Sequence, residues 1–307
     1  MIDIINYEDT FKPSIYNRAD DIYLDIETTG LKRNSDYAWV IGAAFVKENK
    51  IESKQIFIKS KDDEKESLLY LNELLKNKQR IVTFNGNIFD IPFLNERANT
   101  YGISLNFPQD KYDLYELIRK HNKFLMIKRI NLKTAEKFMR IERNDPLAGK
   151  ETLTLYKTYV ETGYDYLKKS LLNHNYYDIK NLPPLMNVNA VIKNYNTLYD
   201  TRFIINDFYI VGNSIVTELI SKRPIPKVCI FDGDISIQGN MNFLQIQFTL
   251  QKAMKDGIEL LYFGDTKKVV KWERIYYTIL RERIEETIKK WLYNIYGGVK
   301  PSIDIFM

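Results

Sequence analysis

Asp25 and Glu27 are two acidic residues placed two positions apart, at the end of the short apolar run 22–26. In a strand, residues two apart project from the same face, so these two carboxylates would lie side by side. Like charges at that separation repel each other unless a cation compensates them. No cluster of His or Cys stands nearby, and such an oxygen donor set suits Mg²⁺ or Mn²⁺. Taken alone, the pair also fits an exposed strand end with two solvated acids.

A third acid, Asp90, opens a segment of helical spacing after a short apolar run and a turn. The string TFNGNIFDIPFL covers residues 83–94, with a turn at Asn85 and Gly86 just before Phe89 and Asp90. An acid at the start of a helix can serve as a simple cap. The string is more particular than a generic cap requires.

A histidine and a fourth acid, His174 and Asp178, stand four positions apart in a segment of helical character. Residues four apart lie on one face of a helix. In that register Asp178 can ligate a metal ion while His174 faces the water bound to it, and imidazole side chains titrate near neutral pH. We interpret His121, the other histidine, as a surface residue.

The elements that must position these residues are predicted from hydrophobic periodicity. Residues 1–20 read as an irregular lead-in. Strands are predicted at 22–26, 37–46, 51–58 and 81–84, and the middle two form a hairpin. Helices are predicted at 64–77, from about 90 to Gly102, and at 113–121, 131–140, 150–162 and 164–181, with Pro183 and Pro184 ending the last one. The fold class is therefore α/β, a mixed sheet with an antiparallel hairpin and flanking helices.

The chain changes character after about residue 200. Short alternating runs punctuated by Gly and Asp predict a smaller β-rich region over 200–307, and it includes an amphipathic helix at 277–295. The best domain division lies near the two prolines, which gives one domain at 21–186 and a C-terminal appendage at 200–307.

Composition limits the classes of protein that this chain can belong to. With 45% hydrophobic and 28% charged residues, the chain is globular rather than disordered. A net charge of +5 is compatible with a phosphate-bearing partner but decides nothing by itself. The single cysteine, Cys229, excludes an intramolecular disulfide and a Cys-rich zinc site, and its apolar neighbours favour a buried structural thiol. We find no signal peptide and no apolar run long enough to span a membrane, so we expect a cytoplasmic protein.

Together, the strings DIETTGL, NGNIFDIPFL and HNYYD resemble the three acidic motifs of the DEDD superfamily of 3′→5′ exonucleases. Residues from about 21 to 186, including the stretches 131–143 and 145–163, are similar to the YprB-like ribonuclease-H-like domains within it. This resemblance implies a ribonuclease-H-like fold, two divalent cations (Mg²⁺ or Mn²⁺), and release of nucleoside monophosphates from the 3′ end of a single strand. The implied metal ligands are Asp25, Glu27, Asp90 and Asp178, with His174 as the general base. Superfamily members with a His base usually place it five residues before the last Asp, so the spacing of four here leaves the subclass open.

The resemblance also implies contacts with the substrate. Leu31 would wedge against the terminal base, the region of Thr28 and Thr29 would approach the terminal sugar, and Asn85 lies in the second motif. Phosphate contacts are predicted among the basic residues of the following helices, namely Lys128, Arg129, Lys133, Lys137 and Lys150.

Three other functions remain open from the sequence. The same metals could serve a structure-specific endonuclease, or the domain could be a non-catalytic nucleic-acid-binding module. The 200–307 region could recruit a protein partner. The motifs do not distinguish DNA from RNA, because the 2′-hydroxyl is recognised by details that they do not record.

Overall fold

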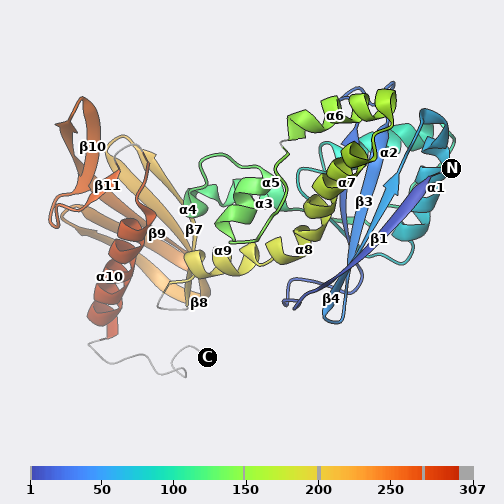
Figure 1. Ribbon diagram of the computed structural model, residues 1–307. Helices are drawn as coiled ribbons and strands as arrows, with labels where there is room; N and C mark the ends of the chain where they lie inside the picture. Colours follow the sequence, from blue (N-terminus) through green and yellow to red (C-terminus); the bar gives the residue numbers. More distant parts are fainter. Residues whose placement is uncertain (1, 148, 199–201, 272–273, 297–307) are drawn as a thin grey trace. The chain divides into compact units, whose positions relative to one another are not determined.

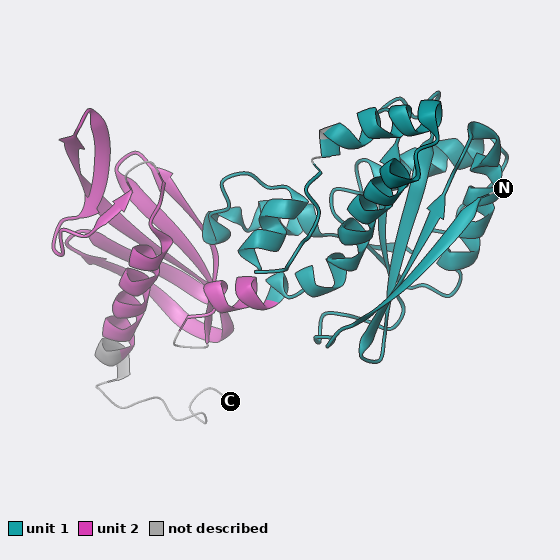
Figure 2. Cartoon of the chain, viewed as in Figure 1, with its two compact units in different colours: residues 1–189 teal, residues 190–307 magenta. Residues whose placement is uncertain are grey.

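The computed structural model of the chain describes residues 2–147, 149–198, 202–271 and 274–296, and only the backbone at 150 and 293–296 (Figure 1). The chain divides into two compact units, Met1–Asn189 and Ala190–Met307 (Figure 2). Each unit is described by itself below.

A six-stranded mixed sheet forms the centre of the first unit, in the order β1-β4-β3-β2-β5-β6. The antiparallel part is β1, β4, β3 and β2, while β5 and β6 run parallel to β2. The strands are β1 (Asp3–Thr10), β2 (Asp21–Thr28), β3 (Ala38–Lys47), β4 (Lys50–Phe57), β5 (Arg80–Thr83) and β6 (Asp110–Asp113). This confirms the predicted mixed α/β class with its antiparallel hairpin.

The prediction of an irregular lead-in at 1–20 is wrong for Asp3–Thr10, which forms the edge strand β1. It pairs with β4 along its whole length, so that Asp3 faces Phe57 and Thr10 faces Lys50. The sequence hides this strand because none of its side chains is fully buried and the apolar alternation is weak. Strand β6 was missed for a similar reason, since its four residues, DKYD, are polar. Pairing with a neighbouring strand, rather than the local hydrophobic pattern, therefore defines both β1 and β6.

Helices cover both faces of the sheet. On one face, Leu68 and Phe93 of two helices pack on Ile22 and Leu24 of β2, and on the other Trp39 stacks on Tyr156 with ring centroids 4.9 Å apart. The helices of this unit, including one short 3₁₀ turn, are η1 (Lys61–Asp63), α1 (Glu64–Leu75), α2 (Asp90–Asn99), α3 (Leu114–Lys120), α4 (Asn122–Leu125), α5 (Leu132–Phe138), α6 (Gly149–Thr162), α7 (Asp165–Lys180) and α8 (Leu182–Leu185). The next helix, α9 (Val188–Asn196), begins in the first unit, and its residues from 190 onward belong to the second.

Helix α7 lies against β2, β3 and β4 and is the helix that matters most for the site (Figure 1). It ends at Lys180, as predicted from the following prolines. The chain does not become irregular there, because Pro183 and Pro184 fall in the first turn of α8, where a missing backbone N–H is tolerated.

The second unit contains a five-stranded antiparallel sheet in the order β11-β10-β9-β8-β7 and one long helix. Its elements are β7 (Phe203–Val211), β8 (Ser214–Asp232), β9 (Ile235–Lys255), β10 (Ile258–Phe263), β11 (Val269–Lys271) and α10 (Tyr277–Tyr296). Aromatic contacts join the helix to the sheet: Trp291 contacts Phe203, and Tyr277 stacks on Phe208 at 5.6 Å. This confirms the predicted β-rich region with an amphipathic helix.

Cys229 is exposed, so the prediction of a buried thiol is wrong. It lies on β8 between Val228 and Ile230, which are half-buried. Side chains alternate across a strand, so the cysteine points to the opposite face. An apolar run in the sequence does not reveal that only one face of the strand is covered. Among the described helices, none combines the length and apolar character that a membrane span requires.

Candidate active site

The first two acids, Asp25 and Glu27, lie at the end of β2, which is the strand between β3 and β5 in the sheet. Asp25 and Glu27 project from the same face of the strand, as their spacing predicts. Asp90 is the first residue of α2, and its Oδ1 accepts a hydrogen bond from the backbone N–H of Ile26 at 3.0 Å. This bond ties the start of α2 to β2 and brings Asp90 beside the first two acids.

The turn before α2 explains why the second motif has such a particular sequence. Asn85 adopts a left-handed conformation with φ of +70°, and a Cβ on Gly86 would come within 2.5 Å of Thr83. The backbone N–H groups of Asn85 and Asn87 donate to the carboxylate of Asp113 at 2.8 and 3.1 Å. The motif therefore shapes the turn that aims Asp90 at β2.

His174 and Asp178 approach the same place from α7, where both are buried. His174 Nε2 lies 3.4 Å from Glu27 Oε1 and 3.4 Å from Asp178 Oδ2. Glu27, His174 and Asp178 each offer a potential ligand atom within 4.8 Å of the others. The fold thus brings together residues that stand about 150 positions apart in the sequence.

Asn175, which the sequence reasoning missed, holds Asp25 in place. Its Nδ2 donates to Asp25 Oδ2 at 2.9 Å. Gly42 of β3 is paired with Asp25 on the neighbouring strand. A Cβ at Gly42 would come within 2.4 Å of the Asn175 side chain and 2.7 Å of Ile179. The absence of a side chain at Gly42 therefore lets α7 come close enough for Asn175 to reach the acid.

Two further donors were also missed, and each holds one oxygen of an acid. Thr152 of α6 is only 2% exposed, and its Oγ1 lies 3.0 Å from Glu27 Oε2 and 2.8 Å from the Gly149 carbonyl, so its hydroxyl proton is shared between these two acceptors. Arg143 Nη2 lies 2.7 Å from Asp178 Oδ1. Such donors fix the orientation of carboxylates that serve as metal ligands. In the sequence Thr152 is one of many polar residues of a helix, and Arg143 lies in a loop with no periodicity, so no signal marked them.

The electrostatics of the acids fit a site for divalent cations. Desolvation raises the pKa of Asp25 well above its usual range, and the neighbouring Asp178 and Asp90 raise it further. Desolvation, with the charge of Asp178, raises the pKa of Glu27 to about 8, although hydrogen bonding to Thr152 opposes it. Desolvation also raises the pKa of Asp90 to about 7, against the opposing bond from Ile26. Acids that resist ionisation together need a compensating cation, and a set of oxygen donors suits Mg²⁺ or Mn²⁺.

The residues predicted to contact the substrate after β2 have the following positions. Leu31 is 79% exposed in the loop after β2 and is available for contact. The Thr28 hydroxyl donates to the Gly30 carbonyl at 2.7 Å, and the Thr29 hydroxyl accepts from Tyr37 N at 3.1 Å. The hydroxyls of both threonines therefore stabilise the turn by hydrogen bonding, whereas the Leu31 side chain is exposed.

The residues predicted to bind phosphate differ in whether their side chains are exposed or paired with an acid. Lys128, Arg129 and Lys137 are exposed. The side chain of Lys133 is 37% exposed, but its Nζ is paired with an acid and lies 3.1 Å from Asp145 Oδ2. The side chain of Lys150 lies outside the described residues.

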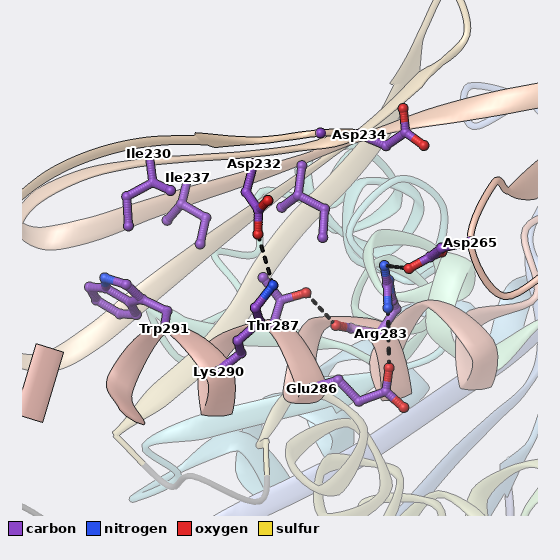
Figure 3. A pocket seen from close by; sticks show the side chains of 12 residues that line it. Ile230, Asp232, Asp234, Ile237, Asp265, Arg283, Glu286, Thr287, Lys290 and Trp291 are labelled. Atoms are coloured by element: carbon purple, nitrogen blue, oxygen red, sulfur yellow. Dashed lines mark hydrogen bonds and ion pairs between the residues drawn. The ribbon is translucent and has the colours of Figure 1, made fainter. Parts of the chain in front are cut away.

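A cavity of about 400 Å³ lies in the second unit between the β8–β9 hairpin and α10 (Figure 3). Charged groups around it pair with each other: Lys290 binds Asp232 at 2.8 Å, and Arg283 binds Asp265 and Glu286. The cavity contains none of the predicted site residues.

The order of the strands, the helices on both faces and the acids at the end of β2 define an RNase H-like α/β domain. The sequence profile of the RNase H superfamily matches residues 22–189, more than half of the chain, and the chain belongs to this superfamily. The search among curated proteins gives no match.

Solved structures with similarity to the chain have low sequence identity. A family B DNA polymerase from the archaeon Pyrobaculum calidifontis is 18% identical, with a TM-score of 0.43, over 56% of this chain and 25% of its own. Brucella melitensis NrnC bound to pGG is 14% identical, with a TM-score of 0.32, over 60% of this chain and 92% of its own. A zinc-bound Escherichia coli ExoI–ssDNA complex is 12% identical, with a TM-score of 0.34, over 67% and 55%. The chain therefore spans a quarter of the polymerase and about half of ExoI.

Proposed function

We propose that the chain is a metal-dependent 3′→5′ exonuclease that hydrolyses single-stranded nucleic acid to nucleoside monophosphates. The observation that carries this proposal is the cluster of Glu27, His174 and Asp178 from β2 and α7, in which His174 Nε2 lies 3.4 Å from both acids. Asp25 and Asp90 are tied to the same elements by hydrogen bonds with Asn175 of α7 and with the Ile26 N–H of β2. Membership of the RNase H superfamily supports it.

Asp25, Glu27, Asp90 and Asp178 are the proposed ligands of two divalent cations. When bound, such cations compensate the negative charge of the phosphate and lower the pKa of a coordinated water. The chain contributes rigidity, because each acid has one oxygen held by a donor: Asn175, Thr152, the Ile26 N–H or Arg143. Carboxylates held in advance need no reorganisation during the reaction.

His174 is the proposed general base. Its Nε2 accepts a proton from water while the water oxygen forms a bond to phosphorus. The bond between phosphorus and the 3′-oxygen of the preceding nucleotide breaks, and that oxygen leaves with the bonding pair and takes a proton from solvent. The products are a nucleoside 5′-monophosphate and a strand shortened by one nucleotide.

Two exposed aliphatic side chains support a substrate with an unpaired end. Leu31 is 79% exposed and Ile88, in the turn before α2, is 59% exposed. Arg33 joins their two loops, because its Nη2 donates to the Ile88 carbonyl at 2.7 Å. We propose that these two residues contact the terminal base, which a paired duplex end would keep stacked on its neighbour.

The test uses single-stranded DNA and RNA of equal length, labelled at the 5′ end. We expect a ladder that shortens from the 3′ end with Mn²⁺ or Mg²⁺ and no product with chelator. Asp25→Asn/Glu27→Gln should reduce the rate by at least about 100-fold, while Asp62→Asn, an exposed acid of η1, should leave it unchanged.

Other results would point elsewhere. Internal cuts on a 3′-blocked strand would replace the proposal with an endonuclease. Retained binding without any cleavage would favour a non-catalytic module, and unchanged activity in Asp25→Ala would remove the proposed metal site.

A further inference from the structure

A second acid of the first unit, Asp145, lies behind His174 on the side away from the metal ligands. Its Oδ2 lies 2.7 Å from His174 Nδ1, whereas the opposite ring nitrogen, Nε2, faces Glu27 and Asp178. Both partners are removed from solvent, because the Asp145 side chain is 0% exposed and the His174 side chain 5% exposed. None of the three acidic motifs contains Asp145, which stands in the loop between α5 and α6.

Several donors hold the Asp145 carboxylate. Arg143 contacts Oδ2 through Nε at 3.1 Å and Nη2 at 2.8 Å, and Lys133 Nζ lies 3.1 Å from the same oxygen. The Leu147 N–H donates to Oδ1 at 3.0 Å. Burial alone would raise the pKa of Asp145, but the hydrogen bond from Arg143, then the positive charge of a protonated His174, and the hydrogen bonds from Leu147 and Lys133 lower it to about 2. A guanidinium, an ammonium group and a backbone N–H are all directed at this carboxylate, an arrangement that favours its ionised form.

An ionised carboxylate can only accept hydrogen bonds. The 2.7 Å contact therefore requires a proton on His174 Nδ1, whatever the charge of the ring. We propose that Asp145 is a positioning residue that holds His174 as the Nδ1–H tautomer, with Nε2 directed at the site as the nitrogen able to accept a proton. The catalytic role of this pairing rests on the proposed function, whereas the pairing of Asp145 with His174 does not.

Arg143 links this pair to the last acid. Its Nη2 lies 2.8 Å from Asp145 Oδ2 and 2.7 Å from Asp178 Oδ1, and its Nη1 lies 3.0 Å from Glu136 Oε1. The guanidinium is a rigid planar fork, so it fixes the distance between its acceptors. Arg143 therefore contacts both Asp145, which holds His174, and the proposed metal ligand Asp178, and so couples the positions of the base and the ligand.

The pairing can be tested by ¹⁵N NMR of the imidazoles in the full chain. The sequence has two histidines, so His121→Gln leaves the ring of His174 as the only signal. At a pH where the ring is neutral, we expect a protonated Nδ1 and an unprotonated Nε2. Asp145→Asn should shift the proton toward Nε2. The matched control is Asp9→Asn, because Asp9 accepts a hydrogen bond from Tyr176 of the same helix at 2.7 Å without touching His174.

The kinetic consequence separates positioning from a general loss of structure. Asp145→Asn should lower kcat by about 10- to 100-fold, while KM and Mn²⁺ affinity change less than twofold. Asp145→Glu should recover part of the rate, and Asp9→Asn should keep all of it.

The outcomes distinguish this inference from the proposed function. A wild-type His174 with its proton on Nε2 would overturn the inference without any variant, as would an unchanged tautomer and kcat in Asp145→Asn. A protonated Nδ1 in a protein that cleaves no nucleic acid would uphold the pairing and remove the exonuclease proposal instead.

Discussion

Protons and metal ions compete for buried carboxylates that face one another, and this competition determines how each acid of the site behaves. Glu27 has a side chain only 16% exposed, and its pKa is raised to about 8 by desolvation and by Asp178. The pKa of Asp90 is raised to about 7, mainly by desolvation. Metal ions bind carboxylates in their ionised form, so protons must leave as the cations arrive.

Metal affinity should therefore rise with pH. Between pH 6.5 and 8.5 we expect Mn²⁺ to bind about 10-fold tighter or more, because Glu27 and Asp90 lose their protons in that window. Isothermal titration calorimetry in buffers of different ionisation enthalpy measures both the affinity and the protons released. An affinity that does not change with pH, with no proton release, would contradict the raised pKa values.

The stability of the metal-free protein should change in the opposite direction. The pKa of Glu27 is raised from 4.5 to about 8 on folding, so between these values the folded state binds more protons than the unfolded state. The stabilisation by this group is present below about pH 4.5 and is lost as pH rises through about 8. Denaturant titrations with chelator, at pH 5.5 and 8.5, should show a smaller difference in Glu27→Gln than in wild type. An equal difference in both proteins would exclude Glu27 as its source.

At the scale of elements, the site depends on how closely α7 approaches the sheet. A Cβ at Gly42 would come within 2.4 Å of Asn175 and 2.7 Å of Ile179. Gly42→Ala should therefore push α7 outward and lower the free energy of unfolding by about 1–3 kcal/mol, with weaker Mn²⁺ binding because Asn175 no longer reaches Asp25. The control is Gly149→Ala in α6, where a Cβ meets nothing within 4 Å. Equal effects in the two variants would argue against a close approach at Gly42.

Helix α6 contributes to the site through one hydroxyl. Thr152→Val keeps the shape of the side chain but removes the donor to Glu27 Oε2. We expect Mn²⁺ affinity to fall by about 10-fold, because the carboxylate loses its orientation. Thr158→Val is the control, since both hydroxyls bond to a carbonyl of their own helix, but among the described residues the Thr158 hydroxyl contacts no acid of the site. Calorimetry with both variants measures the difference, and equal affinities would show that Thr152 does not orient Glu27.

At the scale of the whole molecule, the candidate ligands all fall in one of the two compact units. The first unit has its own core around β2 and β3, and the second buries Phe203, Phe248 and Trp291. We propose that the nuclease domain comprises residues 21–186 together with β1, which belongs to the same sheet. We also propose that 200–307 forms a separate domain and is the region that recruits a protein partner.

Calorimetry of the full chain should therefore show two unfolding transitions. Mn²⁺ at 100 times its Kd should raise the midpoint temperature of one transition by about 5–10 °C and leave that of the other unchanged. The reason is that a ligand stabilises only the unit that binds it. Asp25→Asn/Glu27→Gln should abolish the shift. A single transition that moves as a whole would contradict independent units.

The sequence by itself determined the parts of the site that local pattern encodes. Spacings of two in a strand and four in a helix place Asp25 with Glu27 and His174 with Asp178 on common faces, and the turn string before Asp90 marks the start of α2. The mixed α/β class and the smaller β-rich region followed from hydrophobic periodicity, because burial on one face imposes it.

Only the tertiary structure decided what depends on a distant partner. Edge strand β1 exists through its pairing with β4, and the exposure of Cys229 depends on which face of β8 is covered. Asn175, Thr152, Arg143 and Asp145 are ordinary polar residues in the sequence. They gain a role only when folding brings each within hydrogen-bonding distance of an acid or of His174, because the energy of such contacts depends on three-dimensional proximity and not on position along the chain.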